Sequence, residues 1–175
     1  MQGPSPVVVS LERLGPLAGD AGGLLFFAYW STRSRAIALP PMVAVLLDLA
    51  TLVLMTTAVL GYQLIQDEMP RAWVGWAGVA AVGLGFGGSL PLLCAGLVLF
   101  GLSVTWGGVF PQLPGWLLVV GGLVLMMGWT YASNFGRAFA RPSPWWEAAM
   151  GAALVMVAAA LADLDVLGRE QRTRR

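Results

Sequence analysis

The residue with the clearest chemical potential is Asp48, an acid inside the apolar run ALPPMVAVLLDLATLVLMTTAVLGYQ at residues 38–63. At about 1.5 Å of rise per residue, about 20 apolar residues cross the roughly 30 Å hydrocarbon layer of a bilayer. The run therefore predicts a transmembrane helix with Asp48 near the membrane midplane. An aspartate at that depth costs about 2.5–3.5 kcal/mol on insertion scales, so it marks a candidate functional site.

Three interpretations of Asp48 follow from this cost. A protonated carboxyl group that bonds a threonine, a tryptophan or a backbone carbonyl on a neighbouring helix would be structural. A carboxylate that pairs with a cation from another subunit would mark an interface, and one that reaches water would belong to an ion or proton pathway. Replacement of Asp48 by asparagine separates these cases, because the amide keeps the shape and cannot ionise.

Other polar side chains share the face of the helix that carries Asp48. At 100° per residue, Thr51, Thr56, Tyr62 and Gln63 lie within about 80° of one meridian, while most leucines lie on the opposite side. Polar groups gain nothing from lipid tails, so we expect this face to meet other helices or a water-filled cavity. The predicted polar contact or ion path therefore consists of Asp48, Thr51, Thr56, Tyr62 and Gln63.

The residue types needed for most catalytic and cofactor sites are missing. The sequence has no histidine and a single cysteine, Cys94, so the usual ligands of haem and zinc and the serine and cysteine triads are absent. Asp163 and Asp165 point about 200° apart on a helix and form no carboxylate pair. We expect no catalytic residues, no metal and no cofactor.

A glycine-rich stretch at residues 83–88 formally matches the dinucleotide-binding pattern GxGxxG. That pattern requires a preceding strand and a following soluble helix, which this apolar chain does not offer. We interpret the stretch as a helix end. Gly83 and Gly87 also form a GxxxG pair, which predicts close helix packing.

The composition indicates that the solvent of this chain is lipid. Hydrophobic residues make up 58% of its 175 residues and charged residues 11%, against about 25% charge in soluble domains. Its formal net charge is +1, which argues against a nucleic-acid partner. We expect an integral membrane protein whose partners are the bilayer and other membrane subunits or further copies of itself.

Proline, glycine and tryptophan divide the chain into segments. Residues 16–31 predict an interfacial or re-entrant helix, with a full span as the alternative. The span at residues 40–63 is followed by an apolar stretch at 72–105, which as one helix would be about 50 Å long and is therefore predicted to break near the glycines into spans at 72–87 and 90–107. A further span is predicted at residues 116–132.

The last span begins at residue 143 with signals of a helix N-terminus and is rich in alanine. Ala148, Ala152, Ala159 and Ala162 recur on neighbouring turns and predict close packing against another helix. The tail at residues 169–175 is rich in arginine. The predicted organisation is thus a surface segment at 1–35, a transmembrane helical bundle at 36–168 and this tail.

The fold class predicted is all-α: a polytopic transmembrane helix bundle with about five spans, four to six being compatible with the pattern. With five spans the ten basic residues divide evenly between the two sides and give no orientation. With four, the bias places both termini in the cytoplasm. Exclusive use of arginine with abundant glycine and alanine suggests a high-GC genome, and hence a bacterial inner membrane.

The function predicted first is a non-catalytic accessory or structural subunit of a larger membrane complex. Three features of the sequence motivate it: no cofactor ligands, no soluble domain and no repeated transporter half. The alternative is a small oligomeric transporter or channel in which Asp48, Thr51 and Gln63 line the path. A membrane enzyme comes third.

Overall fold

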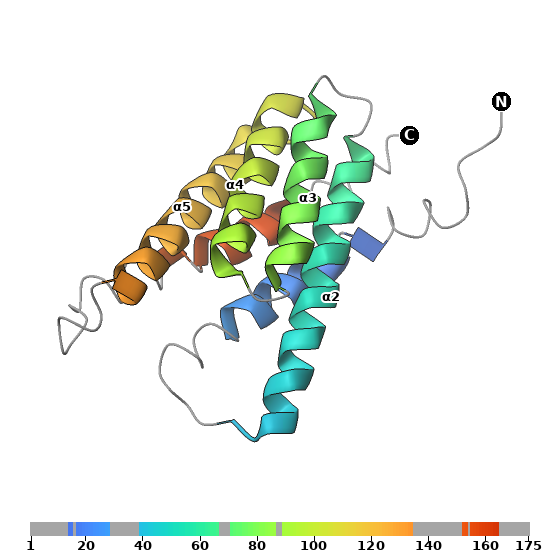
Figure 1. Ribbon diagram of the computed structural model, residues 1–175. Helices are drawn as coiled ribbons and strands as arrows, with labels where there is room; N and C mark the ends of the chain where they lie inside the picture. Colours follow the sequence, from blue (N-terminus) through green and yellow to red (C-terminus); the bar gives the residue numbers. More distant parts are fainter. Residues whose placement is uncertain are drawn as a thin grey trace.

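The structure is a computed structural model, and it describes residues 14–15, 17–28, 39–66, 71–86, 89–134, 152–153 and 155–164. Every regular element in these residues is helical, which confirms the all-helical prediction. The labelled helices are α2 (Pro41–Ile65), α3 (Ala72–Phe86), α4 (Leu90–Gly107) and α5 (Gln112–Asn134). They run side by side and alternate in direction (Figure 1).

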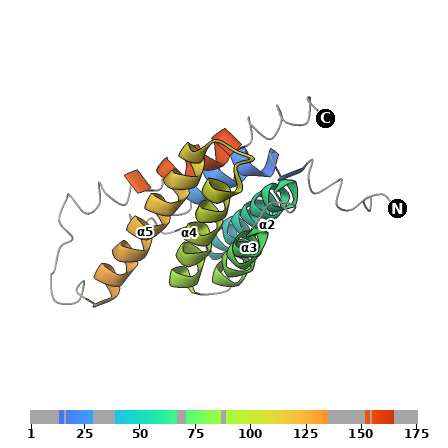
Figure 2. The same cartoon turned by 90° about the horizontal axis from the view of Figure 1, so that it is seen from above.

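Two shorter helices, Leu17–Ala28 and Val155–Leu164, complete the described structure. Seen from above, α5, α4 and α3 form a row with α2 beside α3, and the two short helices lie together along one side of that row (Figure 2). The first and last described helices of the chain are therefore neighbours. A Cβ placed on Gly23 would lie 3.2 Å from the backbone of Ala158, which shows how closely they approach.

The helix boundaries follow the punctuation of the sequence. The helix α2 begins at Pro41 after Pro40, where the missing N–H of proline costs no helical hydrogen bond. The break predicted in the apolar stretch at 72–105 lies between α3 and α4, which begins after Ser89 with Pro91 in its first turn. After α4, Gly108 adopts a left-handed conformation with φ of 69°, which ends the helix.

The helix α2 is the longest of the labelled helices, with α5 next in length. Within the described residues, Pro41–Ile65, with 25 residues, is the one helix long and apolar enough to cross a membrane by length and composition. The other apolar segments are shorter where their side chains are described, namely Leu17–Ala28, Ala72–Gly85, Pro91–Gly107, Gln112–Gly128 and Val155–Leu164. The number of spans, about five, stays a prediction.

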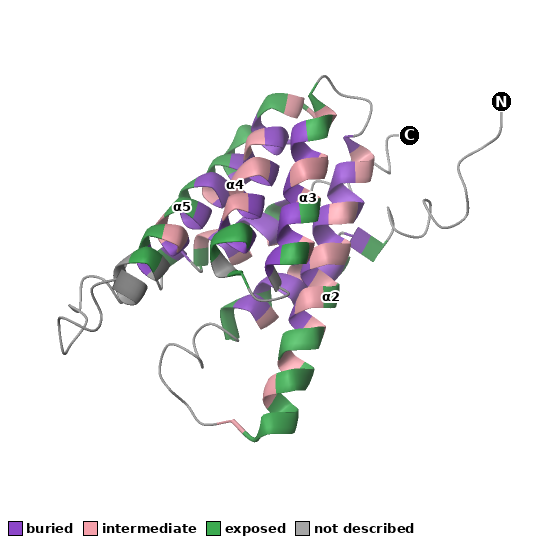
Figure 3. Cartoon of the chain, in the orientation of Figure 1, coloured by how far each residue is buried: buried purple, intermediate pink, exposed green. Residues whose placement is uncertain are grey.

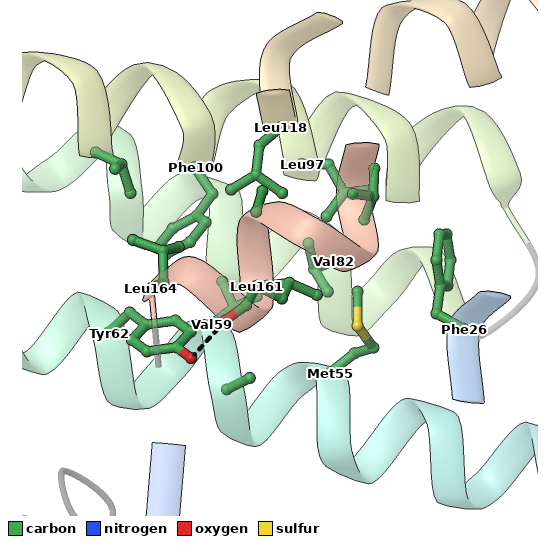
Figure 4. Close-up of a cluster of buried hydrophobic side chains, with 14 of the residues drawn as sticks. Phe26, Met55, Val59, Tyr62, Val82, Leu97, Phe100, Leu118, Leu161 and Leu164 are labelled. Carbon is green, nitrogen blue, oxygen red and sulfur yellow. Dashed lines mark hydrogen bonds between the residues drawn. The ribbon is translucent and has the colours of Figure 1, made fainter. Parts of the chain in front are cut away.

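The core lies where α2, α3, α4 and the two short helices meet. Phe26, Met55, Tyr62, Phe100 and Leu161 are fully buried there, together with smaller aliphatic side chains (Figure 4). The ring of Tyr62 also meets the ring of Phe110 edge to face at 6.1 Å between centroids. The helix Leu17–Ala28, predicted to be interfacial or re-entrant, thus contributes Phe26 to the interior of the bundle.

Candidate functional site

Asp48 lies on the half of α2 that extends beyond the other helices. Gly83 of α3 lies opposite Thr56 of α2, so α3, which ends at Phe86, does not reach the first turns of α2. Residues 41–50, called the projecting segment below, are exposed or half-buried, and Asp48 is among the exposed ones (Figure 3). The neighbouring helices of this chain do not cover the carboxyl group.

Asp48 has no hydrogen bond or ion pair with any residue that the structure describes. The side chains around it on the projecting segment are apolar, and the large exposed ones are Met42, Val43, Val45, Leu46 and Leu49. From Asp48 to the end of α2 at Ile65 the helix rises about 25 Å. The acid is therefore remote from the polar groups that gather near the end of α2.

Three of the remaining members of the predicted polar face, Thr51, Tyr62 and Gln63, are buried and bond within this chain. Thr51 is buried and donates its hydroxyl hydrogen to the Leu47 carbonyl one turn earlier, at 2.7 Å. Tyr62 donates to the Leu161 carbonyl at 3.1 Å and so joins α2 to the helix Val155–Leu164 (Figure 4). The hydroxyl oxygen of Thr56 is buried without a hydrogen-bond partner among the described residues.

Gln63 belongs to a buried cluster of uncharged polar groups, called the amide cluster below, which also contains Gln66 and Ser103. Gln63 Nε2 donates to the Ala72 carbonyl at 3.0 Å. Gln66 Nε2 donates to Gln63 Oε1 at 2.8 Å and to Ser103 Oγ at 3.2 Å. These bonds tie together the end of α2, the first turn of α3 and the last turns of α4.

A glycine leaves the room that the amide cluster occupies. A Cβ placed on Gly75 would collide with Gln63 Oε1 and Ser103 Oγ, so only the bare backbone of α3 fits against the cluster here. Sequence reasoning did not single out Gln66, Ser103 or Gly75. A glutamine that follows another by three residues at a helix end was the available signal, because such residues share a face.

The chemistry available to the amide cluster is hydrogen bonding. Amides and a hydroxyl group neither ionise near neutral pH nor offer a nucleophile with a base beside it. Across the described residues, no group of three or more histidine, cysteine, aspartate or glutamate side chains could hold a metal ion. The arrangement fits a structural role, in which hydrogen bonds hold three helices together. One acceptor, Gln66 Oε1, is buried and has no hydrogen-bond partner within the described chain.

A cation lies at the same end of the bundle as the amide cluster. Arg71 is exposed, and its guanidinium carbon is 5.5 Å from the ring centroid of Trp106, near the end of α4. This distance corresponds to a cation–π contact. The backbone of Arg71 has φ of 70°, in the left-handed region that residues with a side chain seldom adopt.

The structure places the predicted packing residues on different surfaces. Gly83 is half-buried, and a Cβ placed on it would have only Thr56 Cγ2 as a neighbour, at 4.0 Å. A close contact of α3 with α4 lies at Gly78 instead, where a Cβ would lie 2.7 Å from the Phe100 nitrogen. Ala152 and Ala159 are exposed and Ala162 is half-buried. The buried face of the last helix consists of Ala153, Val157, Ala160, Leu161 and Leu164. Gly87, Ala148 and the tail at 169–175 lie outside the described residues.

Sequence reasoning also missed a stripe of small residues at the start of the chain. Gly15, Gly19 and Gly23 recur every four residues, so they share one face of a helix. A Cβ on Gly15 would lie 2.7 Å from Gly61 of α2, and one on Gly19 would collide with the Tyr62 hydroxyl group. The spacing of these glycines was the signal that this helix packs into the bundle.

No protein-family model, curated protein or solved structure matches this chain.

Proposed function

We propose that this chain is a multi-pass integral membrane protein. The charged side chains in the described part are Asp20, Asp48, Arg71 and Asp163, and Asp163 lies near the end of its helix. The large exposed side chains on α3, α4 and α5 are apolar, for example Leu84, Leu92 and Met127. A water-soluble bundle covers its outside with charged groups, so this surface fits lipid.

The helix lengths suggest how the bundle sits in a bilayer. The tryptophans Trp73, Trp106 and Trp116 are exposed where α3 begins, α4 ends and α5 begins, which fits an interfacial aromatic belt. With this end at one membrane surface, Asp48 lies about 25 Å along α2, in the far half of a hydrocarbon layer about 30 Å thick. This placement moves Asp48 from the predicted midplane toward the opposite boundary.

The function proposed for the chain is that of a non-catalytic accessory subunit in a larger membrane complex. The observation that carries this proposal is Asp48, an acid that lies exposed among the apolar side chains of the projecting segment without cover from the described helices. A partner helix that packs against residues 41–50 would bury these side chains and offer a donor or a cation to Asp48. The buried amide cluster, without an ionisable group, fits a structural role.

The alternative, a small oligomeric transporter or channel, would need a path between copies of the chain. Thr51 is buried and bonds to its own helix, and Gln63 is buried in the amide cluster, which argues against a path that they share with Asp48 inside one copy. If the path runs between copies of the chain, Asp48 is the member of the predicted path that is exposed on the outside of one copy. This alternative makes a different experimental prediction from the accessory role.

The two proposals separate when the full chain is purified in mild detergent from its native membrane and the accompanying proteins are identified by mass spectrometry. The accessory role predicts foreign membrane subunits in fixed stoichiometry. A pure homo-oligomer that passes protons or a solute in liposomes would contradict it and support the alternative. In that case, unchanged transport by Asp48→Asn would remove Asp48 from the path.

A further inference from the structure

Arg71 and Trp106 form a small cationic surface at the end of the bundle where α2 meets α3 and α4 meets α5 (Figure 1). Arg71 is the only basic residue in the part of the chain that the structure describes, and it has no ion pair with a described carboxylate. Trp73 is exposed two residues after it. A cation and exposed aromatic rings therefore share one rim of an otherwise apolar bundle.

In the described part of the chain, the guanidinium group of Arg71 contacts the Trp106 ring and donates no hydrogen bond to a described acceptor. The Trp106 ring contacts the guanidinium group at 5.5 Å, and a guanidinium over a ring still directs its N–H donors outward in a planar fork. That fork matches two oxygens of a phosphate group. The backbone of Arg71, with φ of 70°, lies in the left-handed region, which is costly for a residue with a side chain.

We propose that Arg71, supported by Trp106, binds the phosphate of a phospholipid headgroup. The inference depends on the membrane placement proposed above, which puts this rim at the level of the headgroups. Asp67 and Glu68 precede Arg71 in the sequence and lie outside the described residues. The phosphate group is common to zwitterionic and anionic phospholipids, so the site binds both classes.

The test measures lipid bound to the full chain in a phosphate-free maltoside detergent by native mass spectrometry. The added lipids are phosphatidylcholine, phosphatidylglycerol and a diacyl glycolipid that lacks phosphate. We expect both phospholipids to remain bound and the glycolipid to be lost. Equal retention of the glycolipid would overturn the proposal, and so would displacement of lipid by millimolar inorganic phosphate, because that result indicates a soluble phosphate as the ligand.

Variants assign the binding to the two residues. Arg71→Gln should lower phospholipid occupancy about tenfold, since it removes a charge-assisted bidentate contact. Trp106→Leu should lower phospholipid occupancy less. Trp116→Leu is the matched control, because Trp106 is 50% and Trp116 49% exposed. Trp116 lies near the start of α5 and has no described cation beside it. Unchanged retention by Arg71→Gln, with the helical circular dichroism of the wild type, would reject the site.

A separate measurement keeps this result distinct from the membrane proposal. Alkaline carbonate extraction of the native membranes should leave both the wild type and Arg71→Gln in the pellet. Retention in the pellet with unchanged lipid binding by Arg71→Gln rejects only the phosphate site. Release of the wild type into the supernatant rejects the membrane placement, and the phosphate site with it.

Discussion

Gln63 and Asp48 belong to the same face of the same helix, yet their surroundings differ. Gln63 is buried and bonds to the first residue of α3 and to Gln66, whereas Asp48 is exposed on the projecting segment. A helical wheel places both residues on one face, about 60° apart, but contains no information on how far a neighbouring helix extends. Sequence reasoning could therefore assign the polar face and could not tell which part of it the chain itself covers.

The amide cluster gives the sharpest prediction at the residue scale. Gly75→Ala should lower stability by about 1–3 kcal/mol, because its methyl group collides with Gln63 and Ser103 and forces the buried amides apart. Gly83→Ala is the matched control on the same helix, since its Cβ would have only Thr56 Cγ2 at 4.0 Å as a neighbour. Thermal unfolding in detergent, followed by circular dichroism, measures both variants.

In the control, alanine replaces glycine in a helix interior without a clash, so we expect an unchanged or raised unfolding temperature. If Gly75→Ala were as stable as Gly83→Ala, the close contact between α3 and the amide cluster would be wrong.

At the residue scale, Asp48→Asn tests whether the negative charge of Asp48 contributes to binding of the partner subunit. The proposed partner offers a donor or a cation to Asp48, so the neutral amide should reduce the amount of partner subunit that copurifies, by severalfold if the pair is ionic. Asp163→Asn is the control, because Asp163 is also exposed but lies near a helix end. Quantitative mass spectrometry gives the amount of partner subunit per chain for both variants and the wild type. Equal loss of the partner subunit in both variants would argue against a specific role of Asp48.

At the scale of elements, the sequence predicted where helices begin and end better than how they pack. Two prolines mark the start of α2, and the glycine-rich stretch separates α3 from α4, because these residues act on the local backbone. Packing depends on partners that are distant in the chain. The helix Leu17–Ala28 has a short apolar run, which pointed to the membrane surface, while its glycines fit against α2 and the last helix.

The packing of this first helix can be tested with two substitutions that are two residues apart and lie on different faces. Gly23→Leu should disrupt its docking, since a Cβ there would lie 3.2 Å from the Ala158 backbone. Ala21→Leu should be tolerated, because Ala21 is exposed. Limited proteolysis of the detergent-solubilised chain measures docking, with faster cleavage of the first 30 residues expected for Gly23→Leu. Equal cleavage of the two variants would favour the surface helix predicted from the sequence.

At the scale of the whole molecule, the described bundle has an apolar outside and an uncharged polar interior near one end. Composition alone predicted the first property, because so few charged residues are available to cover a surface. The second arises from Gln66 and Ser103, which are 37 residues apart in sequence and meet only in the folded chain. The alanines predicted to pack illustrate the same difference, since Ala152 and Ala159 are exposed and Ala153 and Ala160 are buried.

The accessory-subunit role requires that another membrane protein covers the projecting segment of α2. Asp48, exposed among apolar side chains, is the feature that a partner would bury and lipid would not suit. Met127 on α5 offers a comparison, because it is 61% exposed and Leu46 is 62% exposed. A difference in crosslinking yield between these two positions therefore reports on a specific contact and not on exposure alone.

The most direct measurement is site-specific photocrosslinking in the native membrane from a photoreactive residue in place of Leu46, with Met127 as the reference position. The account predicts that position 46 crosslinks in high yield to a distinct membrane subunit, and that position 127 crosslinks to it weakly. Adducts at position 46 that contain only lipid, or only a second copy of this chain, would contradict the accessory-subunit role.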